Sequence, residues 1–131
     1  MANQLSITNL KTVRGGDSIL VQGKVPPNAE RFAIDLGRDS KNYLIHFNPR
    51  FAEKVIVYNS MTDGNWSTET RDFHFPFKQG EVTKVLFTLE RDEVKVTYPD
   101  GYVFDYKSKS NLDYVDYVQM AGIETQSIDI K

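Results

Sequence analysis

The sequence of 131 residues contains no cysteine, and this absence removes several kinds of chemistry at once. A chain without thiols forms no disulfide bond, has no thiolate metal ligand and has no cysteine nucleophile. We expect no metal ion and no cofactor. The length suits one domain spanning residues 1–131, large enough to bury a hydrophobic core without such supports.

A strong charge of one sign and a long apolar run are also lacking. The formal net charge is −2 with no long run of one sign, which gives no electrostatic reason to expect nucleic acid or an anionic membrane as a partner. No stretch approaches the roughly 20 apolar residues that span a bilayer, and the start, Met1-Ala2-Asn3-Gln4, has no apolar signal core. We expect a protein that is made in the cytosol and does not insert into a membrane.

Short segments typical of β-strands recur at intervals of roughly ten residues. They cover 5–10, 18–24, 32–36, 43–47, 55–59, 82–89, 94–98, 102–106, 117–120 and 127–130. Turn-forming pairs such as Gly15-Gly16 and Pro26-Pro27 separate them. No window keeps a helical period, although 111–115 could form one short turn. The pattern predicts an all-β sandwich or barrel.

One segment, 43–50, combines a core-facing pattern with polar residues at alternate positions. His46, Asn48 and Arg50 leave the same face of a strand, because side chains alternate between the two faces. Leu44 shares this parity, so we expect a mixed face. The opposite parity is apolar and is expected in the core, at Tyr43, Ile45 and Phe47. Further core candidates on other strands are Phe32, Ile34, Ile56, Phe75, Val85 and Phe87.

Further polar and aromatic residues follow within a short stretch of chain. Asn59 ends the next expected strand, and Trp66 follows a turn-prone segment, so it is expected in a loop or at a strand start. Glu69 and Arg71 repeat the alternate spacing. Together with the first group, these residues supply an imidazole, two carboxamides, two guanidinium groups, a carboxylate and the only tryptophan of the chain.

This mixture of side chains fits the chemistry of a sugar ring. Each hydroxyl of a hexose both donates and accepts hydrogen bonds, so it needs groups of both kinds held in place. Arginine only donates, a carboxylate only accepts, asparagine does both, and neutral histidine offers one of each. An exposed indole can cover the patch of C–H bonds on one side of the ring. The residues therefore predict a shallow carbohydrate-binding groove.

At these positions the chain resembles a known family. The runs His-x-Asn-Pro-Arg from His46, Val-x-Asn from Val57 and Trp-x-x-Glu-x-Arg from Trp66 are similar to the β-galactoside-binding signature of the galectins. Supporting segments that are also similar to galectins are Leu36-Gly37-Arg38-Asp39-Ser40, Phe75-Pro76-Phe77 and Pro99-Asp100-Gly101-Tyr102. The resemblance spans nearly the whole chain and implies a jelly-roll β-sandwich of two antiparallel sheets.

The resemblance also implies a role for each residue of the signature. Three side chains would hydrogen-bond the axial 4-hydroxyl that separates galactose from glucose: His46, Asn48 and Arg50. Asn59 and Glu69 would bind the 6-hydroxyl, and Trp66 would stack under the apolar face of galactose. Glu69 and Arg71 would reach the next sugar of lactose or N-acetyllactosamine. These contacts would exclude glucose, because the epimer leaves buried polar groups unpaired.

Two positions bear on specificity beyond the galactose. Many galectins carry a longer loop with an acidic residue after the first arginine, whereas only residues 51–54 intervene here before Val55. This shorter loop affects how Arg50 is supported and how the site accommodates an N-acetyl group on the ligand. Arg31, just before the strand at 32–36, occupies a position that can touch more distant sugars in relatives and is a possible extended-site residue.

By the same resemblance, the partners would be β-galactoside glycans of glycoproteins and glycolipids. A single shallow site binds weakly, so useful affinity needs several sites acting together. We expect a homodimer that cross-links glycans, with apolar contacts from Leu5, Ile7, Ile128 and Ile130, although these residues could equally be buried within the monomer. The expected location is cytoplasmic and extracellular, by a route that needs no signal peptide.

Two other interpretations remain. A glycosidase needs two carboxyl groups facing each other across a bond, but only Glu69 belongs to the polar group, Asp72 has the opposite parity, and Arg71 would lower the pKa of Glu69. We therefore expect no enzyme. The other alternative is a galectin-like structural or protein-interaction domain without sugar binding, and all seven signature residues argue against it.

Overall fold

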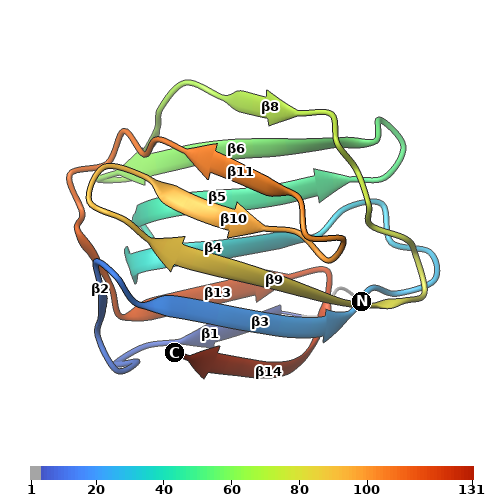
Figure 1. The fold of residues 1–131 in the computed structure, drawn as a ribbon, viewed down its shortest axis with the longest axis horizontal. Helices are drawn as coiled ribbons and strands as arrows, with labels where there is room; N and C mark the ends of the chain where they lie inside the picture. Colours follow the sequence, from blue (N-terminus) through green and yellow to red (C-terminus); the bar gives the residue numbers. More distant parts are fainter. Residues whose placement is uncertain (1–3) are drawn as a thin grey trace.

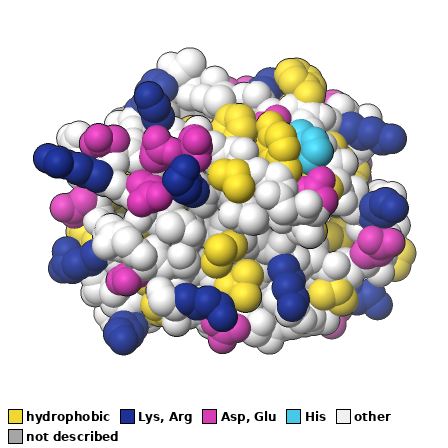
Figure 2. Space-filling view, in the orientation of Figure 1, with side chains coloured by type: hydrophobic (Ala, Val, Ile, Leu, Met, Phe, Trp, Pro, Cys, Tyr) yellow, Lys and Arg dark blue, Asp and Glu magenta, His cyan; other side chains and the backbone are white. Residues whose placement is uncertain are grey.

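The computed structural model describes residues 4–131, so residues 1–3 of the expected 1–131 domain lie outside the described part. Two antiparallel sheets face each other and form a sandwich (Figure 1). Within residues 4–131 every regular element is a strand, which confirms the all-β prediction. Figure 2 shows acidic and basic side chains interspersed on the front of the molecule, in keeping with the small net charge.

The larger sheet has seven strands and lies behind the smaller sheet in Figure 1. Its order is β1 (Gln4–Ile7), β13 (Tyr117–Ala121), β4 (Ala33–Asp39), β5 (Asn42–Arg50), β6 (Val55–Thr62) and β7 (Asn65–Trp66), and β8 (Thr70–Asp72) also pairs with β6. The smaller sheet has the order β11 (Val103–Tyr106), β10 (Val94–Thr97), β9 (Val82–Leu89), β3 (Ser18–Lys24) and β14 (Glu124–Ile130). A separate ribbon joins β2 (Val13–Arg14) to β12 (Tyr114–Val115).

The longer strands were predictable, and the shortest ones were not. The expected segments 18–24 and 82–89 coincide with β3 and β9. The prediction of a short turn at 111–115 is wrong, because Tyr114 and Val115 pair with Arg14 and Val13. Strands β2, β7, β8 and β12 have only two or three residues, which is too short for an alternating pattern to show in sequence.

The core lies between the sheets and anchors β5. Seven of eight predicted core residues are buried: Phe32, Ile34, Ile45, Phe47, Ile56, Val85 and Phe87. The eighth, Phe75, is partly buried and packs against the same core. The Phe47 ring meets Phe87 and Tyr58 edge to face, with ring centroids 5.5 and 5.6 Å apart. Such pairs add about 0.5–1.5 kcal/mol beyond the buried area, so β5 is held firmly on its inner face.

A bulge in β5 overturns two expectations about neighbouring residues. Leu44 was expected on the polar face, but it is buried in the main core, whereas Tyr43 lies in a separate buried cluster with Met61 and Tyr117. The register against β4 and β6 shifts between Tyr43 and His46, so one extra residue reverses the parity before the bulge. His46 and the residues after it keep the predicted faces.

A buried polar network fixes β8 to the opposite sheet. The Tyr98 hydroxyl donates to Asp72 Oδ2 at 2.7 Å, and Tyr58 and Tyr98 hydroxyls lie 2.5 Å apart. Burial raises the pKa of both tyrosines, so both hydroxyls keep their protons and can donate. Since Asp72 faces inward, its neighbour Arg71 on β8 faces the outer side.

Candidate functional site

A groove with a volume of about 480 Å³ lies on the outer face of the larger sheet. Its lining consists of Arg31, Ala33, His46, Asn48, Arg50, Val57, Asn59, Trp66, Ser67 and Glu69. Six of the seven signature residues and the possible extended-site residue Arg31 therefore meet in one place. Arg71 is not part of the lining, but it contacts Glu69. Antiparallel pairing of β4, β5 and β6 brings these distant segments together.

On β5, the protein itself orients Asn48 and Arg50. Asn48 is only 4% exposed, and its amide donates to the Phe32 carbonyl oxygen at 2.8 Å. Its Oδ1 accepts a hydrogen bond from Arg50 Nε at 3.0 Å. The two terminal nitrogens of the guanidinium then remain as donors for a ligand, and their plane is fixed by the Asn48 contact.

Asp35 contacts a groove residue, and the sequence interpretation missed it. It is buried on β4 directly opposite His46 and accepts a hydrogen bond from His46 Nδ1. Burial raises the pKa of the Asp35 carboxyl above its ordinary value, while the contact with His46 acts in the opposite direction. With Nδ1 donating to Asp35, Nε2 of neutral His46 is left as an acceptor. The sequence feature that could have identified Asp35 is its acidic side chain within the otherwise apolar run from Ala33 to Leu36.

Asn59 is oriented by a second missed residue, Ser67. The Asn59 side chain is 6% exposed, and its Oδ1 accepts from the Ser67 hydroxyl at 2.7 Å and from the Ser60 amide at 2.8 Å. These contacts occupy the carbonyl oxygen of the carboxamide. Asn59 therefore presents its amide N–H groups, so it serves the groove as a donor.

Trp66 lines the groove and is half exposed to solvent. It belongs to the short strand β7 and is 50% exposed. The His46 ring lies 4.8 Å from the indole between centroids, inclined at 56°, and Tyr43 lies 5.9 Å away. Contacts with two rings limit the rotation of the indole while leaving much of its surface free. The result is a fixed apolar plate beside fixed polar groups.

Glu69 and Arg71 form an ion pair at the outer edge. Glu69 Oε2 accepts from Arg71 Nε at 3.3 Å and from Nη2 at 3.1 Å. Both side chains are exposed, so the pair contributes little to stability. Its effect is to orient the carboxylate as an acceptor and the guanidinium as a donor beside it.

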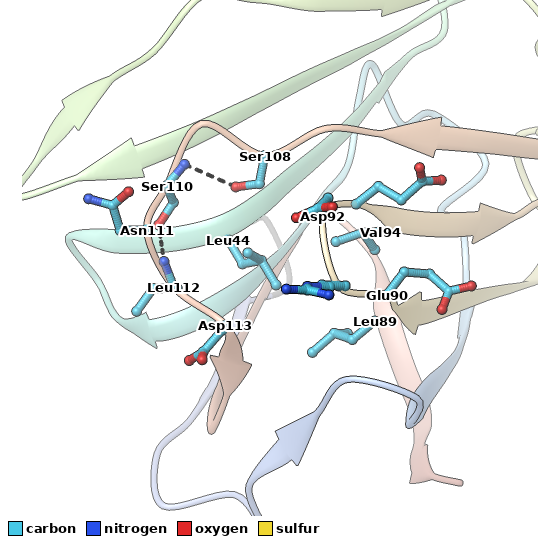
Figure 3. Close-up of a pocket in the computed structure, with 12 residues that line it drawn as sticks. Leu44, Leu89, Glu90, Asp92, Val94, Ser108, Ser110, Asn111, Leu112 and Asp113 are labelled. Atoms are coloured by element: carbon cyan, nitrogen blue, oxygen red, sulfur yellow. Dashed lines mark hydrogen bonds between the residues drawn. The ribbon is translucent and has the colours of Figure 1, made fainter.

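A second cavity, of about 230 Å³, lies elsewhere in the molecule (Figure 3). It is enclosed by the turn between β9 and β10 and by residues 108–113, with Leu44, Leu89, Val94 and Leu112 as its apolar surface and Glu90, Asp92, Glu93 and Asp113 around it. Leu44 points into this space from β5, on the side opposite to Tyr43. None of the signature residues lines it, and its described lining includes no aromatic plate for a sugar.

Residues 4–131 contain neither of two other features, a metal-binding cluster and a membrane-spanning helix. Within this range, no cluster of three or more histidine and acidic side chains is arranged to hold a metal ion. The same range contains no helix with the length and apolarity needed to cross a membrane.

Comparison with known proteins gives concordant results. Residues 4–130 match the family model described as Galactoside-binding lectin. The chain is 36% identical to galectin-1 of Mus musculus over 126 residues, 93% of each chain. The complex of toad ovary galectin with thio-digalactose matches with a TM-score of 0.92 at 30% identity, over 98% of each chain. CG-16, a homodimeric agglutinin from chicken liver, matches with a TM-score of 0.91 at 30% identity, over 98% of this chain and 100% of that one. These matches confirm the expected jelly-roll sandwich.

Proposed function

The chain belongs to the galectins, the family of galactoside-binding lectins, and on that premise we propose that its groove binds β-galactosides such as lactose and N-acetyllactosamine. One observation supports this most strongly: six signature side chains, including the half-exposed indole of Trp66, line a single groove. We further propose that residues 1–131 act as one carbohydrate-recognition domain.

The hydrogen-bond pattern of the groove favours an axial 4-hydroxyl. His46 Nε2 is an acceptor because Nδ1 donates to Asp35, and the Arg50 guanidinium supplies donors beside it. A hydroxyl that donates to His46 and accepts from Arg50 satisfies both groups. Glucose carries this hydroxyl in the equatorial direction, so it would leave partly buried groups without partners, at a cost of about 1–3 kcal/mol.

The remaining signature residues suit the other parts of the ligand. The Asn59 amide would donate to the 6-hydroxyl, and Glu69 would accept from the same hydroxyl. Trp66 would cover the C–H face of galactose. Arg71, which holds Glu69 from outside the groove, would reach the adjoining sugar. We propose Asp35 and Ser67 as positioning residues, because each bonds a groove side chain.

We propose that two chains associate and cross-link glycoconjugates. The edge strands β1 and β14 lie at the same side of the two sheets, where each can pair with another strand (Figure 1). Leu5, Ile128 and Ile130 pack against the core of their own monomer, which favours backbone pairing over apolar contact as the basis of association. The match with a homodimeric agglutinin supports this assembly.

The site of action follows from the ligands. We propose that the protein leaves the cytoplasm by a route without a signal peptide and meets the β-galactosides of glycoproteins and glycolipids outside the cell. The absence of cysteine suits an oxidising exterior, because no thiol can be lost there to oxidation.

Neither rival function has comparable support. For a glycosidase, the carboxyl group nearest to Glu69 along β8 belongs to Asp72, which bonds Tyr98 on the inner side of the sheet. A domain that has lost sugar binding would not need Asn48, Asn59 and Glu69 held by specific hydrogen bonds. We therefore propose a lectin without catalytic activity.

Calorimetric titration with lactose tests the proposal. The wild type should bind, and Arg50→Ala and Trp66→Ala should each weaken binding at least about ten-fold, as expected for a lost charged hydrogen bond or a lost aromatic surface. Lys24→Ala, an exposed change on the smaller sheet, should behave like the wild type. Lactose binding that survives both groove substitutions would place the ligand elsewhere.

A further inference from the structure

Phe73 is 72% exposed, the largest exposed fraction among the exposed large hydrophobic residues of the described chain. Single exposed apolar residues are common on protein surfaces, so exposure alone assigns no role. The position of Phe73 is informative, because it directly follows β8, which carries Arg71, the partner of the groove residue Glu69.

Contacts of its two neighbours show which way Phe73 points. Asp72 accepts a hydrogen bond from the Tyr102 hydroxyl at 3.4 Å, and the His74 ring stacks on the Tyr102 ring with centroids 3.9 Å apart. Both neighbours therefore face the smaller sheet. Phe73 lies between these two residues and is exposed, so its side chain points away from the smaller sheet, to the side that Arg71 faces.

Strand pairing places Phe73 level with the groove. Asp72 pairs with Ile56, the last residue pair between β8 and β6, and Phe73 comes one residue beyond it, towards the Val55 end of β6. Val55 in turn pairs with Arg50, which lines the groove. Two strand spacings of about 4.8 Å put the Phe73 backbone about 10 Å from that of Arg50, which is the scale of a disaccharide.

The chain around Phe73 is held in place and the adjoining turn is short. In the turn at 51–54, the Lys54 amide donates to the Phe51 carbonyl oxygen at 3.3 Å, and Lys54 has φ of 51°. The Phe75 ring packs edge to face on Phe51 at 5.4 Å, which anchors the segment that follows Phe73. Phe73 is thus an exposed ring on a supported backbone.

We propose that Phe73 determines specificity for the group attached to the reducing end of the bound disaccharide. This inference rests on the proposed galactoside function, in which galactose lies over Trp66 and the next sugar lies at Glu69 and Arg71. A substituent on that second sugar leaves the groove beyond Arg71 and meets the Phe73 ring. The preferred substituent has a flat apolar surface, because aromatic rings gain most from stacking against such surfaces.

Titration with three lactosides tests this role. Methyl β-lactoside carries the smallest substituent, butyl β-lactoside an alkyl chain, and phenyl β-lactoside a flat ring. The wild type should bind the phenyl compound about five-fold more tightly than the methyl compound, with the butyl compound between them. In Phe73→Ala the ratio between phenyl and methyl compounds should fall to about one, and Phe73→Trp should restore it. Val82→Ala, a change at an exposed apolar residue of β9, should keep the wild-type ratio.

The outcomes separate this inference from the proposed function. Equal binding of the three lactosides by the wild type, or an unchanged ratio in Phe73→Ala, would overturn the role of Phe73 while leaving galactoside binding intact. A wild type that binds none of the three compounds would overturn both.

Discussion

Asp35 controls which nitrogen of His46 is available to a ligand, because it binds Nδ1. Substitutions of Asp35 can separate the effect of this hydrogen bond from the effect of the carboxylate charge. Asparagine keeps an acceptor oxygen for His46 Nδ1, whereas leucine removes it. We expect Asp35→Asn to bind lactose within about three-fold of the wild type and Asp35→Leu to bind at least about ten-fold more weakly. Calorimetric titration measures both. Equal losses in the two variants would show that the negative charge, not the hydrogen-bond direction, matters.

The raised pKa of Asp35 predicts a pH-dependent cost to stability. Because burial disfavours the charged carboxylate, the protonated carboxyl of Asp35 is the form that favours the folded state. Its contribution to stability is complete below the ordinary pKa of 3.8 and is lost as pH rises through the raised pKa. Asp35→Asn has no charge to bury. We expect its free energy of unfolding to increase relative to the wild type as pH rises through that window. Urea unfolding at pH 4 and pH 7 measures the difference, and a difference independent of pH would refute this expectation.

Sequence alone identifies the residues of the groove but not those that support them. His46, Asn48 and Arg50 were recognisable because alternate spacing on one strand puts them on one face. Asp35 and Ser67 were not recognised, because their contacts depend on the register between strands that are distant or separated by a turn. A bond across strands leaves no local periodic signal.

Among the strands, the β5 bulge is another feature that local sequence does not predict. Alternation from Ile45 to Arg50 was predictable, but the shift between Tyr43 and His46 depends on how β5 meets β4 and β6. Gly37 takes part in this fit, because a Cβ there would collide with the Asn42 carbonyl oxygen. As a consequence, Leu44 lies in the core and the Tyr43 ring contacts the Trp66 indole.

The attachment of β8 to the smaller sheet gives a prediction for this element. Tyr98→Phe removes the hydroxyl that donates to buried Asp72 and should lower the free energy of unfolding by about 1–3 kcal/mol. Lactose affinity should fall about three-fold, because β8 carries Arg71. Tyr102→Phe is the matched control, since its contact with Asp72 is 3.4 Å long and should cost less. Urea unfolding and lactose titration compare them; equal losses would argue against a special role for Tyr98.

At the scale of the whole molecule, the sandwich class was predictable from recurrent short strands, and the galectin resemblance selected the jelly roll. The order of strands in each sheet was not predictable from periodicity, because β1, β13 and β4 become neighbours only through long-range pairing. That order creates the groove on one face and leaves β1 and β14 as edges.

Association through these edges predicts that cross-linking depends on protein concentration. Dilution below the dimer dissociation constant should abolish agglutination of galactose-bearing cells, while each groove keeps its affinity for lactose. Sedimentation velocity over a concentration series gives the fraction of dimer for comparison with agglutination. Agglutination that persists where only monomer sediments would contradict the dimer proposal.

Recognition of the axial 4-hydroxyl underlies the proposed function, and one pair of disaccharides isolates it. Cellobiose differs from lactose only in the orientation of that hydroxyl on the non-reducing sugar. Calorimetric titration of the wild type should show binding of lactose and at least about ten-fold weaker binding of cellobiose, the difference expected when polar groups of the groove lose their partner. Equal affinities for the two disaccharides would show that the groove does not recognise the axial 4-hydroxyl.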